Sequence, residues 1–282
     1  MRCSMITVVV AAAAVAAGID LLTFHFVLFK STMTAAQPSL NVVLVDIEGT
    51  TTSISFVHDV LFPYAKENVQ QYLQETWNSD ATKDIVQDLQ QTPQFAEWRS
   101  TLNSSMDTID EPLITDFVRY LIDKDLKVTP LKTLQGLIWA RGYAAGQLKG
   151  HVYEDVPAAF EAWRNAGLRV AVYSSGSVAA QKLIFHHSIA GDLLRHISAH
   201  FDTHVGHKQQ TESYTKIAEA LQVPPEKVIF LTDVAGEADA ARAAGMQTRI
   251  LQRPGNAALS EDQKSTYQLI EDFTSLQTLQ LS

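Results

Sequence analysis

"NVVLVDIEGTTTS", Asn41 to Ser53, places two carboxylates directly behind a short apolar run. Val42 to Val45 predicts a strand that is buried on both faces, because no polar residue interrupts the run. Asp46 follows this run at once and Glu48 comes two residues later, so both side chains point to the same side of an extended chain. Gly49 then lets the chain turn tightly. The stretch is typical of a strand that brings an acidic pair to a site at its carboxyl end.

Two later apolar runs also end on polar residues. Leu168 to Tyr173 precedes Ser174, and Lys227 to Leu231 precedes Thr232 and Asp233. Helical patterns alternate with these runs, which predicts an α/β fold with a Rossmann-like core of parallel strands and helices on both faces. Sites in open parallel sheets lie at the carboxyl ends of the strands. We therefore expect these polar strand ends to form one site.

A long helical pattern separates the first strand from the second. Apolar residues recur at helical spacing from about residue 59 to residue 146, and Thr129 with Pro130 is typical of a helix start. This pattern predicts an inserted all-helical cap at 59–146. The core would then comprise residues 39–58 and 147–282.

Residues 1–38 form an apolar leader ahead of the core. Val8 to Phe29 is almost entirely apolar, although Asp20 lies within it. A carboxylate in mid-membrane costs about 3 kcal/mol, and Met33 is a plausible start for the domain that follows. We interpret the leader as a non-native or dispensable extension, while targeting or anchoring by residues 1–32 stays open.

The charge and cysteine content narrow the function classes. The net charge is −9 and no basic stripe occurs, which argues against a nucleic-acid partner. Cys3 is the single cysteine, so an intramolecular disulfide is excluded and a reducing compartment is expected. An acidic chain must hold an anionic substrate by local positive charge.

The expected strand ends suit phosphoryl transfer. Asp46 and Asp233 would repel each other as neighbours, and a divalent cation such as Mg²⁺ relieves that repulsion. An aspartate nucleophile with a second acid nearby can take up a phosphoryl group and then activate water. Hydroxyls and a lysine would hold the phosphate oxygens; the candidates are Ser174, Ser175 and Lys208.

Four histidines precede or flank Lys208: His196, His200, His204 and His207. Their spacing of three or four residues would suit a metal site on one helix. The segment "AHFDTHVGH" instead has the texture of an irregular region or a short strand, so scattered histidines are the better interpretation.

Four segments together resemble the haloacid dehalogenase-like phosphohydrolases: "VVLVDIEGTT", "VAVYSSGS", "GHK" and "VIFLTD". Glu48 stands where most members of that superfamily have Asp. With "DIEGTTTSISFVHDVLFPYA", "LTDVAGEADAARAAGM" and "RPGN", the chain from about residue 41 to residue 273 resembles the enolase-phosphatases of methionine salvage.

The resemblance implies a role for each matching residue. It implies that Asp46 and Glu48 are catalytic, and that Ser174, Ser175 and Lys208 bind substrate. The implied magnesium site, with one Mg²⁺ per subunit, comprises Asp46, Glu48 and Asp233. Val234 stands where many relatives have a second acid, and whether Glu237 supplies that charge stays open.

The resemblance also implies a reaction. The substrate would be 2,3-diketo-5-methylthiopentyl-1-phosphate, which is enolised and then hydrolysed to the acireductone 1,2-dihydroxy-3-keto-5-methylthiopentene. We expect a monomer in the cytoplasm, and also in the nucleus, with no membrane partner. Two alternatives stay open: a related phosphatase acting on another small phosphorylated metabolite, and a membrane-tethered binding protein without catalysis.

Overall fold

The computed structural model describes residues 40–102 and 108–276. The predicted leader, residues 1–38, lies outside these residues, so its interpretation stays a prediction. Ser39–Ser282 forms one compact unit. Within the described ranges, no helix combines the length and the apolar character needed to cross a membrane.

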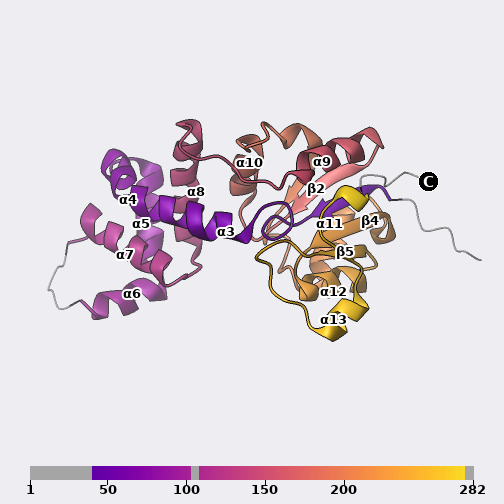
Figure 1. Ribbon diagram of the computed structural model, residues 1–282. Coiled ribbons are helices and arrows are strands. Elements are labelled where there is room, and N and C mark those ends of the chain that lie inside the picture. Colours follow the sequence, from indigo (N-terminus) through magenta and orange to yellow (C-terminus); the bar gives the residue numbers. More distant parts are fainter. Residues whose placement is uncertain (1–39, 103–107, 277–282) are drawn as a thin grey trace, which may run out of the picture. The chain divides into compact units, whose positions relative to one another are not determined.

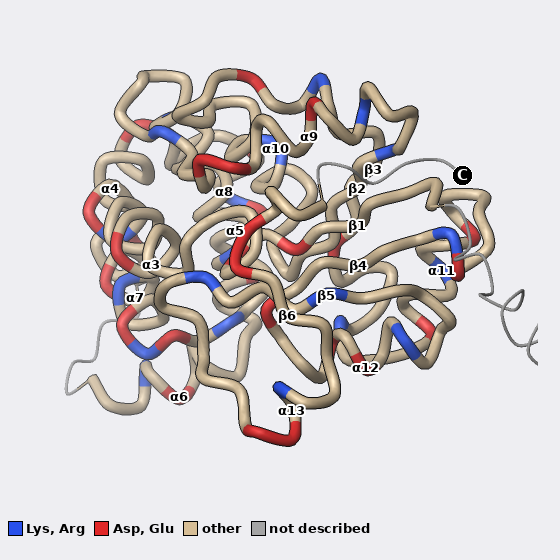
Figure 2. Tube along the Cα trace, turned by 45° about the vertical axis from the view of Figure 1, so that its right-hand side comes forward, with Lys and Arg blue, Asp and Glu red and all other residues tan. Residues whose placement is uncertain are grey.

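One parallel sheet organises the described chain. Its strands are β1 (Val42–Val45), β2 (Arg169–Tyr173), β3 (Ile197–Phe201), β4 (Val228–Thr232), β5 (Gln247–Leu251) and β6 (Leu269–Ile270). They lie in the order β3-β2-β1-β4-β5-β6, and each neighbouring pair is parallel (Figure 2). In register, Val45 of β1 lies beside Val172 of β2 and Leu231 of β4. The predicted α/β class with a parallel core is confirmed.

Helices cover both faces of this sheet. The core helices are α9 (Asp155–Asn165), α10 (Val178–His186), α11 (Thr211–Leu221), α12 (Ala235–Ala243) and the short α13 (Glu261–Thr266). Val43 and Val45 pack in one hydrophobic cluster with residues of α9 and α10, while Val42 and Leu44 pack in another with residues of α11 and α12. Because alternate residues of a strand face opposite sides, β1 must be apolar throughout.

Five of the helices between β1 and β2 have a hydrophobic cluster of their own. They are α4 (Phe62–Thr76), α5 (Asp80–Gln90), α6 (Pro93–Ser100), α7 (Glu111–Asp123) and α8 (Thr129–Ala144), drawn in purple to magenta in Figure 1. Side chains from all five, including Trp98 and Phe117, form this cluster. Ser79, Thr92 and Asp110 cap three of the helices through their side chains. We refer to α4–α8 as the cap, and its predicted boundaries at residues 59 and 146 remain an interpretation.

The structure adds elements that the sequence pattern did not predict. Helical backbone begins at Ile54 rather than Asp59, with α3 (Ile54–Phe56) and the π-helical turn η1 (Val57–Leu61) leading directly into α4. β3 and β6 form the two edges of the sheet. β3 was missed as a definite strand because its residues, such as Ser198 and His200, are mixed in polarity and only partly buried.

Candidate active site

The turn after β1 is held by hydrogen bonds to one carbonyl. The backbone N–H groups of Thr50, Thr51 and Thr52 donate to Ile47 O at 3.2, 2.9 and 2.9 Å. Thr51 Oγ1 also donates to Asp46 O at 3.1 Å. All three threonine side chains are buried. The run of threonines therefore closes a compact turn, which we call the acidic loop (residues 46–52), directly behind Asp46.

Gly49 lets this loop approach β4 closely. Its φ is +70°, and a Cβ at this position would stand 2.4 Å from Asp233 Oδ2. No side chain fits there, and L-residues with a Cβ also disfavour such a φ. The glycine thus gives the Asp233 carboxylate its place next to the acidic loop.

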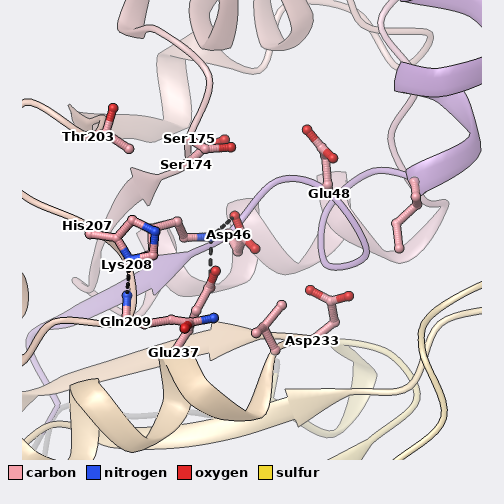
Figure 3. A pocket seen from close by; sticks show the side chains of 12 residues that line it. Asp46, Glu48, Ser174, Ser175, Thr203, His207, Lys208, Gln209, Asp233 and Glu237 are labelled. Carbon is pink, nitrogen blue, oxygen red and sulfur yellow. Dashed lines mark hydrogen bonds and ion pairs between the residues drawn. The ribbon is translucent and has the colours of Figure 1, made fainter. Parts of the chain in front are cut away.

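Lys208 joins two carboxylates at the bottom of the pocket. Its Nζ lies 2.6 Å from Asp46 Oδ1 and 2.8 Å from Glu237 Oε2, and the lysine is only 7% exposed (Figure 3). Glu237 also accepts a hydrogen bond from Thr232 Oγ1 at 2.8 Å. Glu237, whose role the sequence left open, is therefore the second partner of Lys208.

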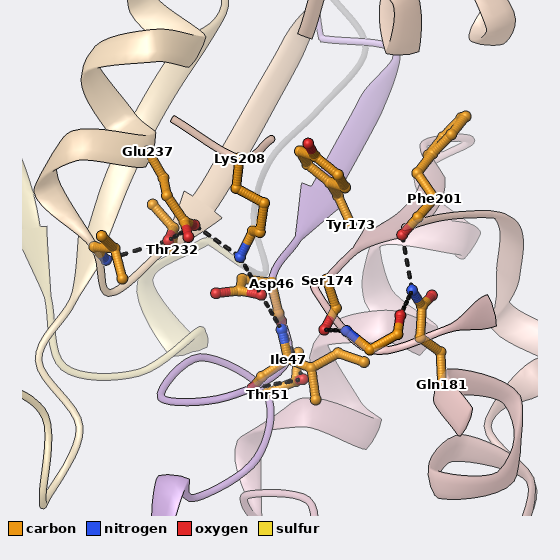
Figure 4. Close-up of polar contacts among 12 residues, drawn as sticks. Asp46, Ile47, Thr51, Tyr173, Ser174, Gln181, Phe201, Lys208, Thr232 and Glu237 are labelled. Carbon is orange, nitrogen blue, oxygen red and sulfur yellow. Dashed lines mark hydrogen bonds and ion pairs between the residues drawn. The ribbon is translucent and has the colours of Figure 1, made fainter. Parts of the chain in front are cut away.

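Asp46 is oriented by two contacts to the same oxygen. Lys208 Nζ and the backbone N–H of Ile47 both reach Asp46 Oδ1, the latter at 2.7 Å (Figure 4). Within the described residues, no hydrogen bond or ion pair is made by Oδ2. The carboxylate is thus fixed through one oxygen, and the other is left available for chemistry.

The pocket holds more acidic groups than basic ones. Burial, and then the charge of Asp46, raise the pKa of Asp233 to about 7 and that of Glu237 to about 7. The same two causes raise the pKa of Glu48. Burial lowers the pKa of Lys208, but Asp46 and Glu237 raise it by more, so the lysine stays charged. Such an excess of carboxylates favours a further cation.

The serine pair lies across the pocket from Glu237. Ser174 follows β2 and is buried, whereas Ser175 is exposed. Gln181 Nε2 holds the following turn by donating to Gly176 O at 2.9 Å and to Phe201 O at 2.7 Å (Figure 4). Neither serine hydroxyl donates to a protein acceptor within the described residues, so both are available to a ligand.

The structure brings the predicted residues together. One pocket of about 320 Å³ is lined by Asp46, Glu48, Ser174, Ser175, Lys208 and Asp233, with Glu237, Thr203, His207 and Gln209 (Figure 3). The sequence did not single out Thr203 or Gln209, and no motif marks them. Of the four histidines that precede or flank Lys208, His207 lines this pocket, whereas His200 contacts Gln181 and His204 contacts Asp202.

A second cavity of about 410 Å³ adjoins this pocket and shares Glu48, Ser174, Ser175, Thr203 and His207 with it. Its remaining lining is mainly apolar. It comes from the cap and the turn before it, including Leu61, Phe62, Leu121 and Trp139, and from the core, including Ile47, Ala180 and Ile184. Helical spacing predicts that Leu61, Phe62, Trp98, Phe117 and Trp139 lie in the core of the helical bundle. Trp98 and Phe117 do lie in the hydrophobic cluster of the cap. Leu61 and Phe62 instead pack in the cluster of Val43 and Val45, Trp139 packs against both clusters, and all three line this cavity.

The donor set fits a hard divalent cation. Asp46 and Asp233 bring carboxylate oxygens to this pocket, and Glu48 lines it with them; oxygen ligands of this kind are the ones that Mg²⁺ binds. Asn256 Oδ1 is buried close to Asp233 without a hydrogen-bond partner. In the described chain, no cluster of three or more His, Cys, Asp or Glu could hold a metal through side chains alone. Main-chain oxygens and water would therefore complete the coordination.

Comparison with known proteins identifies the class of protein to which this fold and site belong. A family model for haloacid dehalogenase-like hydrolases matches residues 40–245. The chain therefore belongs to the haloacid dehalogenase-like hydrolases, and within them to the enolase-phosphatase E1 family, as the following relatives show. Enolase-phosphatase E1 of Drosophila virilis is 72% identical over 88% of this chain and 99% of its own length. That of Drosophila grimshawi is 68% identical over 86% of this chain and 99% of its own length.

A solved structure is also similar to this chain in fold and in sequence. The UTR4 protein of Saccharomyces cerevisiae superposes with a TM-score of 0.68 at 32% identity, covering 84% of this chain and 100% of that one. The predicted resemblance to the enolase-phosphatases is thus confirmed.

Proposed function

We propose that this protein is a bifunctional enolase-phosphatase of methionine salvage. It converts 2,3-diketo-5-methylthiopentyl-1-phosphate to its enol and then hydrolyses the phosphate ester, which gives 1,2-dihydroxy-3-keto-5-methylthiopentene. The observation that carries this proposal is the pair of joined cavities, one lined by carboxylates and a lysine and the other mainly apolar. A phosphate at the first and a methylthio chain in the second match the two ends of this substrate.

The polar pocket supports hydrolysis through a covalent intermediate. Asp46 Oδ2 attacks phosphorus, the ester P–O bond breaks, and the leaving oxygen takes a proton from Glu48. Water then attacks the phosphorus and gives a proton back to Glu48, and the bond between Asp46 and phosphorus breaks to release phosphate. Lys208 holds Asp46 Oδ1 throughout, which keeps the nucleophile aligned.

The phosphate oxygens need donors, and the pocket supplies them. Ser174, Ser175 and Lys208 line it together with Asp46 and Asp233. Asp46, Asp233 and the main-chain carbonyl of Glu48 would hold one Mg²⁺. When bound, Mg²⁺ supplies Lewis-acid polarisation of carbonyl and phosphate oxygens.

Glu48 is placed to serve both chemical steps. Its side chain lies apart from the group formed by Lys208, Asp46 and Glu237 (Figure 3), and it lines both cavities. Its raised pKa suits a group that gives and takes protons. We assign to Glu48 the transfer of a proton from the substrate carbon to the carbonyl oxygen that becomes the enol hydroxyl. Protonated again from solvent, the same carboxyl then gives a proton to the leaving oxygen.

Two assays on one sample test the proposal. The diketone phosphate should give an ultraviolet absorbance from the enol first and inorganic phosphate afterwards, both dependent on Mg²⁺. A panel of simple phosphate monoesters of similar size should release phosphate at least tenfold more slowly. Equal rates across the panel without an enol trace would favour the alternative phosphatase. Absence of phosphate release from every ester would favour a binding protein.

We also propose a monomer that acts in the cytoplasm and the nucleus. The single compact unit formed by Ser39–Ser282 already contains every residue assigned to the site. Gel filtration with light scattering tests the monomer, and fractionation of cells that make the full chain tests the location. An alkali-resistant membrane pellet would instead indicate anchoring by residues 1–32.

A further inference from the structure

The loop after β5 reaches back to the acidic loop through one amide. Asn256 Nδ2 donates to Gly49 O at 2.9 Å and to Leu251 O at 3.1 Å. Both partners are carbonyls, so the two N–H groups of the amide are used and its orientation is determined. The other end of the amide, Oδ1, must therefore be the atom that faces away from these carbonyls.

This oxygen lies in an unusual place. Asn256 Oδ1 is buried and, among the described residues, has no hydrogen-bond partner. The point where a Cβ of Gly49 would stand lies 2.9 Å from Asn256 Oδ1 and 2.4 Å from Asp233 Oδ2. Two acceptor oxygens thus border the same small space. A buried acceptor without a donor is costly, so a donor is expected between or beside them.

We propose that Asn256 is a positioning residue of the metal site, an inference that rests on the proposed Mg²⁺-dependent function. Its Oδ1 accepts a hydrogen bond from a water molecule bound to the cation that Asp46 and Asp233 hold. Its Nδ2 at the same time holds the Gly49 carbonyl, and with it the acidic loop. Residues that orient metal ligands in this way commonly change metal affinity by roughly 10–100-fold when they are removed.

Arg253, on the same loop, helps to separate the two roles of Asn256, which are holding the acidic loop and orienting the metal-bound water. Arg253 Nε donates to Thr50 O at 3.2 Å, and its guanidinium pairs with Asp155 at 2.7 and 2.8 Å. The acidic loop is thus anchored at Thr50 independently of Asn256. The unpaired Oδ1 of Asn256 adds nothing to that anchoring, which leaves a ligand as its partner.

The test measures Mg²⁺ binding alone, by calorimetry on the full chain without substrate. Asn256→Ala should weaken Mg²⁺ binding roughly 10–100-fold. Asn256→Asp keeps an acceptor oxygen and adds a negative charge near the cation, while Arg253 still holds the acidic loop at Thr50. Its Mg²⁺ affinity should therefore be no more than about threefold weaker than that of wild type. Equal weakening in both variants, or unchanged affinity in Asn256→Ala, would overturn the proposal.

Gln181→Ala is the matched control, because Gln181 is also an amide that holds two carbonyls, but on the serine side of the pocket. Gln181→Ala should raise the KM for substrate and leave the Mg²⁺ affinity unchanged. If it instead weakened Mg²⁺ binding as much as Asn256→Ala, the effect of Asn256→Ala would reflect a general loss of order in the pocket, and the proposal would be wrong. Thermal unfolding checks that each variant folds. If Asn256→Ala does not fold, Asn256→Asp decides alone, and a tenfold loss of affinity contradicts the inference. A wild-type protein that binds no Mg²⁺ would instead remove the metal from the proposed function.

Discussion

Replacing Gly49 by alanine should separate backbone strain from damage to the site. The φ of +70° costs a residue with a Cβ about 1–2 kcal/mol. The new Cβ would also stand 2.4 Å from Asp233 Oδ2 and 2.6 Å from Asp233 Cγ, so this carboxylate has to move. A displacement of roughly 1 Å in a reacting site lowers the rate about 100-fold. We therefore expect Gly49→Ala to lose about 100-fold in kcat/KM beyond its loss of stability.

Gly146→Ala is the matched control, since it has the same φ of +70° but no atom within 4 Å of its Cβ position. Urea unfolding should show about 1–2 kcal/mol of destabilisation in both variants. Phosphate release and Mg²⁺ titration should be affected only in Gly49→Ala. Wild-type kcat/KM in Gly49→Ala, or an equal loss in Gly146→Ala, would refute the conclusion that Gly49 makes room for the Asp233 carboxylate.

Three further predictions follow from the site and its surroundings. Asp46→Asn should lower phosphate release by roughly 10³-fold or more, while a metal-loaded sample still forms the enol; phosphate release above a few per cent of wild type contradicts the covalent step. Chelator should abolish phosphate release, Mg²⁺ should restore it, and Ca²⁺ should inhibit because it prefers more ligands in looser geometry; full activity in excess chelator contradicts this. Burial lowers the pKa of His200 to about 4, below the ordinary value of 6.5, so its neutral form stabilises the fold above pH 6.5 and this contribution is lost as the pH falls towards 4. Urea unfolding at pH 7 and pH 5 should therefore show a smaller acid-induced loss in His200→Gln than in wild type, and an equal loss would show that another group is responsible.

The central strands were predictable because both of their faces are buried. Val42 to Val45 and Val228 to Leu231 are uninterrupted apolar runs in the sequence and are fully buried in the fold. The edge strand Ile197–Phe201 was not predicted as such, since one of its sides has no neighbouring strand and its residues are only partly buried. The hydrophobic pattern of a segment therefore predicts its burial well. It predicts a strand only where the strand is also buried.

The residues of the site also fall into a group that the sequence could predict and a group that it could not. Residues that end an apolar run, such as Asp46 and Asp233, could be placed near each other from sheet geometry alone. The pairing of Lys208 with Glu237 could not, because it depends on how the loop after β3 approaches the start of α12. The role of Asn256 could not be predicted from the sequence either, since its contact with Gly49 joins segments 207 positions apart.

The strand order sets the sequence of events during synthesis on the ribosome. β1 is made first, yet both of its neighbours in the sheet, β2 and β4, come later, after the whole of the cap. The cap helices have a hydrophobic cluster of their own and can begin to pack as they emerge. The backbone N–H and C=O groups along both edges of β1 meanwhile have no neighbouring strand, and Asp46 has neither Lys208 nor Asp233 beside it. A nascent chain is therefore inert towards phosphate esters until β4 has emerged, and a product that stops short of β4 leaves its first strand open to other nascent chains.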